Sequence, residues 1–370
     1  MRVLVVGGGI GGLSAAIALR QRDVDVDIVE INPRWDVYGV GIIQPGNAIR
    51  ALDALGLAEQ AVAQGYAMKG SRFHNSQGDL LGEVPALDLL GPRYPAMNGL
   101  TRPKLHALFQ EAVKASGADI RLGVTVDRVG EDGGVELSDG SAGEYDLVVG
   151  ADGIHSKVRS LVFADAPEPE FTGQIVWRYN VPRPEGLETL DMFVGANGKA
   201  GFVPLGPDLM YILYIEAVAP EDVKMPDDRL AEIFRERLAE FGGPVAEVRD
   251  RYITDPANVV VRPVESLLVP KPWHRGRVVL IGDAAHATSP HVGQGGAMAM
   301  EDAIVLSEEV TTTDGEAALE RYVERRYPRC REIWEISRQI GTWEIEHTPP
   351  PEADFVGLTM RSVHVTAAPI

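Results

Sequence analysis

The sequence contains a single cysteine, Cys330, in 370 residues. One cysteine excludes a disulfide within the chain, a metal site built from several thiolates, and the redox-active dithiol that many flavin reductases use. Positive charge is also scarce, since 35 Lys and Arg oppose 54 Asp and Glu and give a formal net charge of −19. No Lys/Arg run of the kind that such partners need is present, so we expect neither nucleic acid nor an anionic membrane surface as a partner. We also expect no metal.

Long apolar runs are missing as well, and no segment approaches the ~20 residues that a membrane-spanning helix needs. The first apolar run begins at residue 2, which leaves no room for a signal peptide, and we therefore expect a cytoplasmic protein. The 45% hydrophobic and 24% charged residues are ordinary for a globular chain. At this length the chain can hold one large domain or two.

The start of the chain carries a nucleotide-binding pattern over residues 2–30. A Val-rich run predicts a buried parallel strand, an Ala/Leu/Ile segment predicts a helix, and a second strand ends in Glu30. Between the first strand and the helix lie five glycines, three of them spaced as G-x-G-x-x-G: Gly7, Gly8, Gly9, Gly11 and Gly12. Strand, glycines, helix, strand and acid occur in the order that a dinucleotide-binding unit requires.

Each part of this pattern has a physical purpose. Gly7 permits a sharp turn, Gly9 lets the backbone approach a pyrophosphate, and Gly12 lets the helix pack closely on the sheet. The helix N-terminus offers free N–H groups to the phosphates. Glu30 can accept hydrogen bonds from ribose hydroxyls and disfavours a 2′-phosphate, so the pattern predicts FAD or NAD here and not NADP.

Two further motifs follow strands predicted later in the chain. One strand leads into Asp152-Gly153 and a polar turn, and another leads into Gly282-Asp283. The second is followed by a loop with Pro290 and by a glycine cluster at 293–296 that opens a helix. An aspartate at the carboxyl end of a strand suits a polyol chain, and glycines at a helix start suit a ligand oxygen. Alone, either Asp-Gly pair is typical of a plain turn.

Together the three motifs resemble the FAD-dependent aromatic hydroxylases, the single-component flavoprotein monooxygenases of the 4-hydroxybenzoate hydroxylase fold. The resemblance extends over nearly the whole chain and rests on GGGIGG at 7–12 with Glu30, ADGIHSKVR at 151–159, and GDAAHATSPHVGQGGAMAMEDA at 282–303. It implies that Asp283 binds the ribityl chain of FAD. It also implies contacts with FAD, or with the passage of NAD(P)H, for a further set of residues: Gly7, Gly9, Gly11, Gly12, Glu30, Arg102, Asp152, Arg159, Gly295 and Gly296.

The resemblance further implies a reaction. NAD(P)H, binding transiently, reduces a tightly but non-covalently bound FAD, O2 forms a flavin C4a-hydroperoxide, and its terminal oxygen attacks an electron-rich aromatic ring. The protein has to exclude water and to favour the ionised form of the substrate, which is a phenolic or hydroxylated N-heteroaromatic compound. The oligomeric state, monomer or homodimer, stays open. The segment Ile42-Ile43-Gln44 departs from the polar residue that many relatives carry there.

The expected fold class is α/β, with a Rossmann-like FAD-binding domain, an inserted antiparallel-sheet substrate domain and a C-terminal helix. The pattern assigns 1–70, 98–170 and 258–315 to the FAD-binding domain and 71–97 and 171–257 to the substrate domain. Residues 316–370 are expected to form a closing helix and an irregular strap.

Three residues are candidates for contact with the substrate. Tyr214 lies on a predicted strand, DLMYILYIE, for which relatives acting on hydroxypyridines and purines suggest a functional tyrosine; packing in the core is the alternative. His291 follows Pro290 in the predicted flavin loop and is a candidate acid/base or hydrogen-bond partner. Arg178 could hold an anionic substituent or the cofactor, or form a structural salt bridge.

Other functions remain open at this point. Flavin-dependent halogenases of this fold carry a W-x-W-x-I-P signature, and WRYNVP at 177–182 lacks its second Trp. Epoxidation on a similar FAD domain is a related alternative. The intact glycine-rich segments argue against a flavin-less prenyl-binding escort protein, and a plain NAD dehydrogenase would leave residues 282–296 unexplained.

Overall fold

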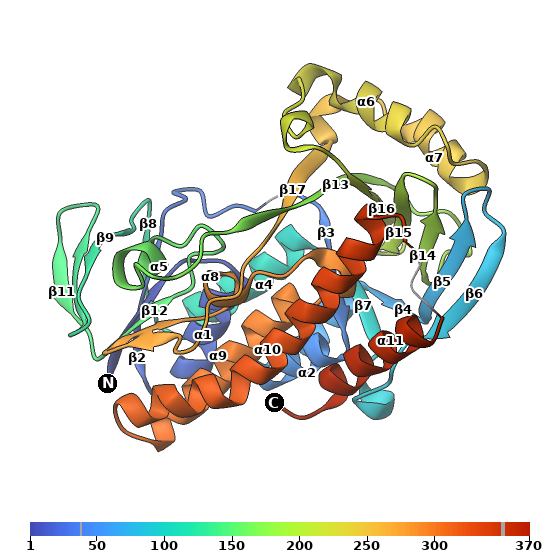
Figure 1. Ribbon diagram of the computed structural model, residues 1–370. Coiled ribbons are helices and arrows are strands. Elements are labelled where there is room, and N and C mark those ends of the chain that lie inside the picture. Colours follow the sequence, from blue (N-terminus) through green and yellow to red (C-terminus); the bar gives the residue numbers. More distant parts are fainter. Residues whose placement is uncertain (38, 349–351) are drawn as a thin grey trace.

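The centre of the protein is a six-stranded, mainly parallel sheet (Figure 1) in a computed structural model that describes residues 1–37, 39–348 and 352–370. Its strand order is β18-β19-β12-β1-β2-β8, and only β18 pairs antiparallel. The Val-rich strands β1 and β12 are buried on both faces, which explains their continuous apolar runs. The strands are β1 (Arg2–Val6), β2 (Asp25–Glu30), β8 (Asp119–Leu122), β12 (Leu147–Gly150), β18 (His274–Arg275) and β19 (Val278–Leu280).

Helices pack against this sheet and against one another. Helix α1 (Ile10–Arg20) contacts α4 (Arg102–Ala115) and α9 (Gly295–Thr312). Helix α10 (Glu316–Ile345) runs along α9 and reaches the second large sheet at its far end (Figure 1). The remaining α-helices are α2 (Gly46–Ala54), α3 (Ala58–Gln64), α5 (Lys157–Val162), α6 (Leu230–Arg237), α7 (Gly243–Tyr252), α8 (Asp283–His286) and α11 (Glu352–Ala367).

The second large sheet has seven strands in the order β17-β13-β16-β15-β14-β5-β6. All neighbours pair antiparallel except β14 with β5. Helices α6 and α7 cover one of its faces (Figure 1), where an aromatic-rich core forms. Its strands are β5 (Gly70–Asn75), β6 (Leu80–Pro85), β13 (Glu170–Pro182), β14 (Leu190–Val194), β15 (Gly198–Pro204), β16 (Leu209–Ala217) and β17 (Val260–Ser266).

The opposite face of the seven-stranded sheet packs on a small sheet with the order β3-β7-β4. A third core, mostly aliphatic side chains and methionine, lies between them. The small sheet comprises β3 (Gly41–Pro45), β7 (Met97–Thr101) and β4 (Tyr66–Met68). The other elements are a three-stranded sheet of β9 (Val126–Val129), β10 (Gly134–Leu137) and β11 (Ala142–Glu144), and the 3-10 turns η1 (Gly91–Arg93), η2 (Pro220–Asp222), η3 (Asp227–Arg229), η4 (Pro256–Asn258) and η5 (Pro290–Val292).

The expected fold class is confirmed, because a parallel sheet with helices, an antiparallel sheet and a C-terminal helix are all present. The expectation of an irregular strap was wrong for residues 352–367, which form α11 against α2 and α10; residues 349–351 lie outside the described part of the chain. The division into domains stays a prediction, although strand β17, assigned to the FAD-binding part, pairs with β13 of the seven-stranded sheet. Among the described residues, no helix combines the length and apolar character that crossing a bilayer requires.

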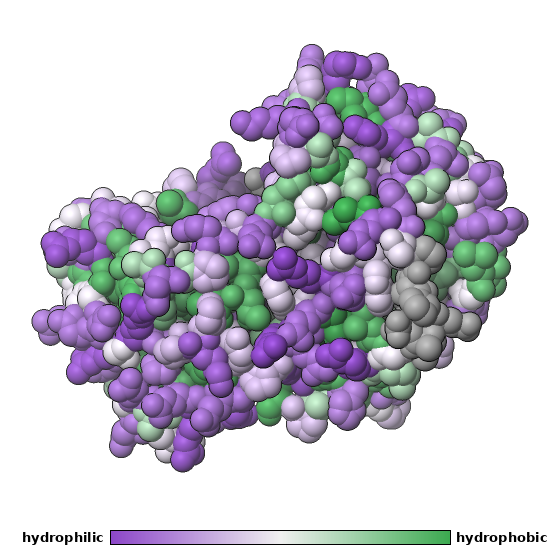
Figure 2. Space-filling model, in the orientation of Figure 1, coloured by the Kyte–Doolittle hydropathy of each residue, from purple (hydrophilic) through white to green (hydrophobic). Residues whose placement is uncertain are grey.

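The surface in Figure 2 is mainly hydrophilic, with separate hydrophobic patches. One of them lies at the edge strand β6, where Leu80, Leu81 and Val84 are each about half exposed or more. Scattered exposed apolar side chains are ordinary on a protein surface.

A buried group of charged side chains holds α9, α10 and the turn before α8 together. Asp302 accepts the Gly282 N–H at 2.9 Å and lies 2.5 Å from His286 Nε2 through one oxygen, and accepts Arg326 Nε at 2.8 Å through the other. Asp302, His286 and Arg326 are almost completely buried. Burial alone would raise the pKa of Asp302, but His286 and Arg326 lower it to about 2. Burial would lower the pKa of His286, and the charge of Asp302 instead raises it well above its usual value.

The Cys330 thiol lies beside the same carboxylate, 3.9 Å from Asp302 Oδ1. His286, Asp302 and Cys330 thus bring metal-type ligand atoms within 4.8 Å of one another. The Arg326 guanidinium already pairs with Asp302, and its fixed positive charge opposes a cation at this position. We interpret the group as structural.

We expect Asp302→Asn to lower the free energy of unfolding by about 3–5 kcal/mol, because it removes the carboxylate that pairs with the buried His286 and leaves Glu301, 3.0 Å away, as the one buried anion beside Arg326. Urea unfolding followed by circular dichroism measures this change. The wild-type stability supplied by Asp302 should be present above the unfolded pKa near 3.8 and be lost as the pH falls toward 2, and the variant should lack this acid-dependent part. Glu335→Gln, at an exposed pair with Arg331, is the control, with a change of about 0.5 kcal/mol. Equal stability of Asp302→Asn and wild type would contradict the role.

Candidate functional site

Three glycines of the loop between β1 and α1 differ in how much space surrounds them. Gly7 has φ +111°, and a Cβ there would lie 2.4 Å from the Ala151 carbonyl oxygen. A Cβ at Gly12 would lie 1.9 Å from the Gly7 carbonyl oxygen, so the helix packs against the loop itself. A Cβ at Gly9 would meet nothing within 4 Å, and Gly9 is exposed at the N-terminus of α1. The loop therefore presents open backbone beside a helix N-terminus, as an anion site requires.

Glu30, at the end of β2, lies against this loop. Its carboxylate accepts the Gly8 N–H and the Asn32 N–H, both at 2.7 Å. The Gly8 carbonyl oxygen is bonded in turn by Trp35 Nε1 at 2.9 Å and by His106 Nε2 at 2.8 Å. The Gly8 peptide is thus held on both sides. Sequence reasoning missed Trp35 and His106, because neither belongs to a pattern that marks them.

Asp283 and the start of α9 come together beyond the end of β19. A Cβ at Gly295 would lie 3.9 Å from Asp283 Oδ1, and a Cβ at Gly296 would lie 3.3 Å from Ile42 Cδ1. Asp283 keeps solvent-exposed surface. The protein atoms around its carboxyl group nevertheless displace part of the surrounding water, and this desolvation raises the pKa of Asp283. A Cβ at Gly11 in α1 would be 3.4 Å from α9, so the two glycine-rich helix starts are neighbours.

A second tyrosine of strand β16, Tyr211, and Arg178 of β13 share the face of the seven-stranded sheet opposite α6 and α7. Arg178 pairs with Leu213 in the strand register, and Tyr211 is two residues further along the same face. A Cβ at Gly41 would lie 2.6 Å from the Tyr211 ring. Burial raises the pKa of Tyr211, opposed by the nearby positive charges of Arg178 and Arg102. Tyr211, Arg178 and the exposed Arg102 therefore surround one region.

Arg178 is half-buried, and burial lowers its pKa. Within the part of the chain that the structure describes, its guanidinium has no hydrogen-bond or ion-pair partner. A desolvated guanidinium without an anion is costly, which makes Arg178 a candidate ligand-binding group and not the structural salt-bridge residue of the alternative.

Tyr214 does not belong to this region, and its location agrees with the alternative of packing in the core; its contact with the substrate stays a prediction. It lies on the opposite face of β16, in the core beneath α6 and α7, with its ring 5.9 Å from that of Phe241 in an edge-to-face arrangement. The register pairs it with the buried Trp177. The strand alternates between two faces, and the sequence pattern did not reveal which face meets the small sheet.

His291 lies in η5, directly before the glycines that open α9. Its ring is fully buried, with Nδ1 2.8 Å from Ser289 Oγ and Nε2 3.0 Å from Glu344 Oε2. Burial lowers the pKa of His291 in spite of the nearby Glu344, so the imidazole is neutral. Both ring nitrogens already have protein partners, and an acid/base role toward the substrate stays an untested prediction.

Asp152 caps the helix that follows it. Its carboxylate accepts hydrogen bonds from Ser156 Oγ at 2.5 Å and from the backbone N–H groups of Lys157 and Val158 at 2.7 and 3.0 Å. The polar atoms of its side chain are therefore directed at α5. Arg159 of that helix donates to the Ala284 carbonyl at 3.1 Å and ties it to the Gly282-Asp283 turn.

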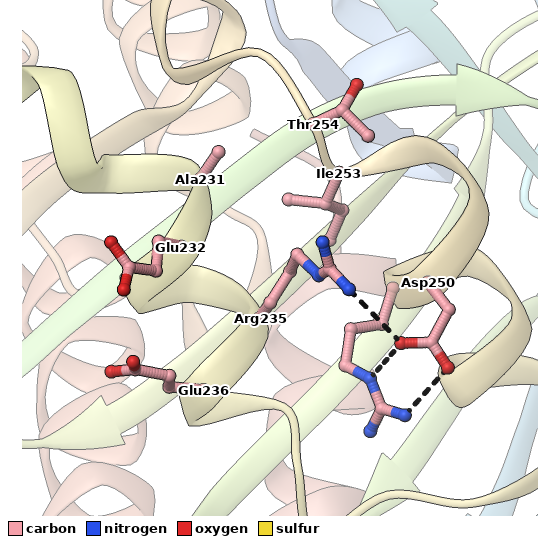
Figure 3. Close-up of a pocket in the computed structure, with 8 residues that line it drawn as sticks. Ala231, Glu232, Arg235, Glu236, Asp250, Ile253 and Thr254 are labelled. Carbon is pink, nitrogen blue, oxygen red and sulfur yellow. Dashed lines mark hydrogen bonds and ion pairs between the residues drawn. The ribbon is translucent and has the colours of Figure 1, made fainter.

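Two hollows in the described structure lie elsewhere. One, of about 450 Å³, lies between α6 and α7 (Figure 3), where Asp250 pairs with Arg235 and Arg249. Charged side chains that already pair with one another make it unsuitable for an aromatic ring. The other, of about 150 Å³, lies beside His291 and the end of α10.

The chain matches the model of a family described as FAD binding domain over residues 1–337. It is 33% identical to the 2-heptyl-3-hydroxy-4(1H)-quinolone synthase of Pseudomonas aeruginosa over 357 residues, 93% of this chain and 90% of that protein. It is also 33% identical to the aurachin C monooxygenase/isomerase of Stigmatella aurantiaca over 356 residues, with the same two shares. A crystal structure of Klebsiella pneumoniae HpxO complexed with FAD and uric acid superposes with a TM-score of 0.86 at 25% identity, covering 100% of this chain and 97% of that chain.

Proposed function

The chain belongs to the FAD-binding-domain family of FAD-dependent monooxygenases, and on that basis we propose that it hydroxylates an electron-rich aromatic or N-heteroaromatic compound. FAD is its cofactor. When bound, FAD accepts electrons from a reductant and activates O2 for transfer to the substrate. We propose NADH or NADPH as the reductant, because the chain has one dinucleotide fingerprint and FAD uses it.

The residues present fit FAD. The open backbone at Gly9 and the N-terminus of α1 suit the pyrophosphate, and Glu30 suits the ribose hydroxyls. Asp283, an exposed carboxylate next to the start of α9, suits the ribityl hydroxyls. Gly295 and Gly296 leave the first N–H groups of α9 accessible to the oxygens of the flavin ring.

The observation that carries the substrate assignment is the unpartnered, half-buried Arg178 beside Tyr211. A guanidinium in such surroundings stabilises a negative charge on a ring oxygen or a carboxylate. An ionised ring is the stronger nucleophile, and the Tyr211 hydroxyl can donate a hydrogen bond to that oxygen. The quinolone synthase named above and the uric acid bound to HpxO support an N-heteroaromatic ring.

The aliphatic core next to these two residues excludes water. Val203, Leu205 and Leu213 share its buried surface with Tyr211. Apolar surroundings without water lower the local dielectric constant, which strengthens the attraction between Arg178 and an anionic substrate. They also limit the wasteful release of peroxide.

The function is tested by NAD(P)H oxidation with the FAD-loaded protein, with and without a panel of phenols, hydroxybenzoates, hydroxypyridines and hydroxyquinolones. We expect one ring class to stimulate oxidation together with O2 consumption and formation of a hydroxylated product. Bound flavin without stimulation by any member of the panel would contradict the substrate proposal and leave the family assignment intact.

Asp283→Ala should weaken FAD binding by about 10- to 100-fold, because charged hydrogen bonds contribute about 1.5–3 kcal/mol each. Titration of the apoprotein with FAD, followed by flavin fluorescence, measures the change. Asp314→Ala, at an exposed aspartate between α9 and α10, should bind FAD as the wild type does. An unchanged Kd for Asp283→Ala would remove the ribityl assignment.

The two tyrosines of β16 offer a matched pair of variants. Tyr211→Phe should lower kcat/KM for hydroxylation by about 10-fold or more, through loss of a hydrogen bond to a charged group, and raise the share of NAD(P)H that yields peroxide. Tyr214→Phe makes the same chemical change in the far core and should leave both quantities within about twofold. The reverse order of the two variants would show that Tyr214 acts on the substrate.

A further inference from the structure

One carboxylate near the end of α10 joins three separate parts of the fold. Glu344 accepts hydrogen bonds from His291 Nε2 at 3.0 Å and from Gln174 Nε2 at 3.1 Å through Oε2, and pairs with Lys199 through Oε1. His291 belongs to η5, while Gln174 and Lys199 belong to β13 and β15 of the seven-stranded sheet. The segment before the glycines of α9 and the sheet that carries Arg178 are thus linked through one side chain.

The packing around this carboxylate is close. A Cβ at Gly341 of α10 would lie 3.1 Å from both His291 Cε1 and Gln174 Oε1, so the helix approaches the loop through a position without a side chain. Ser337 Oγ, also in α10, donates to the Ser289 carbonyl at 2.8 Å. Helix α10 therefore contacts the loop at two neighbouring positions, Ser289 and His291.

The protonation states of Glu344 and His291 allow one arrangement of hydrogen bonds between them. Burial alone would raise the pKa of Glu344, but its hydrogen bond with His291 and the charge of Lys199 lower it to about 2. The imidazole of His291 is neutral, since burial lowers its pKa. The network is satisfied when Nε2–H donates to Glu344 and Nδ1 accepts the Ser289 hydroxyl, which fixes the tautomer and the orientation of the ring.

We propose that Glu344 is a positioning residue that fixes the segment 290–296, and with it the first N–H groups of α9, relative to the sheet bearing Arg178 and Tyr211. The inference rests on the proposed flavin site. His291 is two residues before Gly293, whose left-handed backbone (φ +63°) leads the chain into α9. Loss of Glu344 frees the His291 ring and loosens the backbone that has to meet the flavin.

The test is a double-mutant cycle with FAD affinity as the readout. Glu344→Ala and His291→Ala should each raise the Kd for FAD by about 5- to 20-fold and alter the visible absorption bands of the bound flavin. The double variant should be within about twofold of the weaker single variant, because both remove one contact. Glu335→Ala, at an exposed residue of the same helix, should match the wild type.

A conservative variant separates positioning from general stability. Glu344→Gln keeps an acceptor oxygen for His291 and should restore the Kd to within about threefold of wild type. If Glu344→Ala does not fold, the Kd of His291→Ala tests the same contact from its other side. Unchanged FAD affinity and spectrum in Glu344→Ala, or in His291→Ala where that variant replaces it, or effects that add in the double variant, would overturn the inference. A lower Tm of the apoprotein with a wild-type Kd would also overturn it, since the contact would then be structural only.

The same titrations separate this inference from the flavin site on which it rests. Weak FAD binding by Asp283→Ala together with wild-type binding by Glu344→Ala would overturn the positioning role alone. Wild-type binding by Asp283→Ala would instead overturn the flavin assignment.

Discussion

The ionised carboxylate of Asp302 is the constraint on which the rest of the site depends. It reaches from α9 to the Gly282 N–H before α8 and to Arg326 of α10, and so fixes three elements at one point. Gly282 has φ +59°, and its turn directs Asp283 toward the start of α9. A buried ion pair contributes little net stability, but it defines geometry, because removing either partner leaves an uncompensated charge. The hydrogen bonds of Asp302 thus fix the turn that precedes Asp283.

Much of the cofactor site could be predicted from the sequence because its signals are local. Gly7, Gly9 and Gly12 follow a buried strand within a few residues, and Glu30 ends the next strand. Gly7 and Gly12 have no room for a Cβ, and Gly9 leaves open backbone at the start of α1, so all three positions favour glycine and the motif is visible in the sequence. The fold class followed from the same local patterns, since Val-rich runs and Pro/Gly-bounded strands differ in periodicity.

The residues that we propose to face the substrate could not all be predicted from the sequence, because their positions depend on long-range packing. Strand periodicity separated Tyr211 from Tyr214, but which face meets the small sheet is decided by contacts such as that of Gly41 with Tyr211. The junction at Glu344 joins residues 53 and 145 positions apart, which no local pattern indicates. Helix α11 was mistaken for a strap because the three prolines at 349–351, directly before it in the sequence, suggested irregular chain.

The protein is negatively charged overall, whereas its candidate site is positively charged. The two are compatible because most of the negative charges are far enough from the site to be screened. The chain carries a net charge of −19, yet Arg102, Arg178 and Arg262 lie close enough to influence one another at the face of the seven-stranded sheet. At physiological ionic strength exposed charges more than about 8 Å away are largely screened, whereas partly buried charges act across a lower dielectric. The anionic ring of the proposed function would therefore gain its attraction within the site, where the charges of Arg178 and Arg102 would also favour its ionised form.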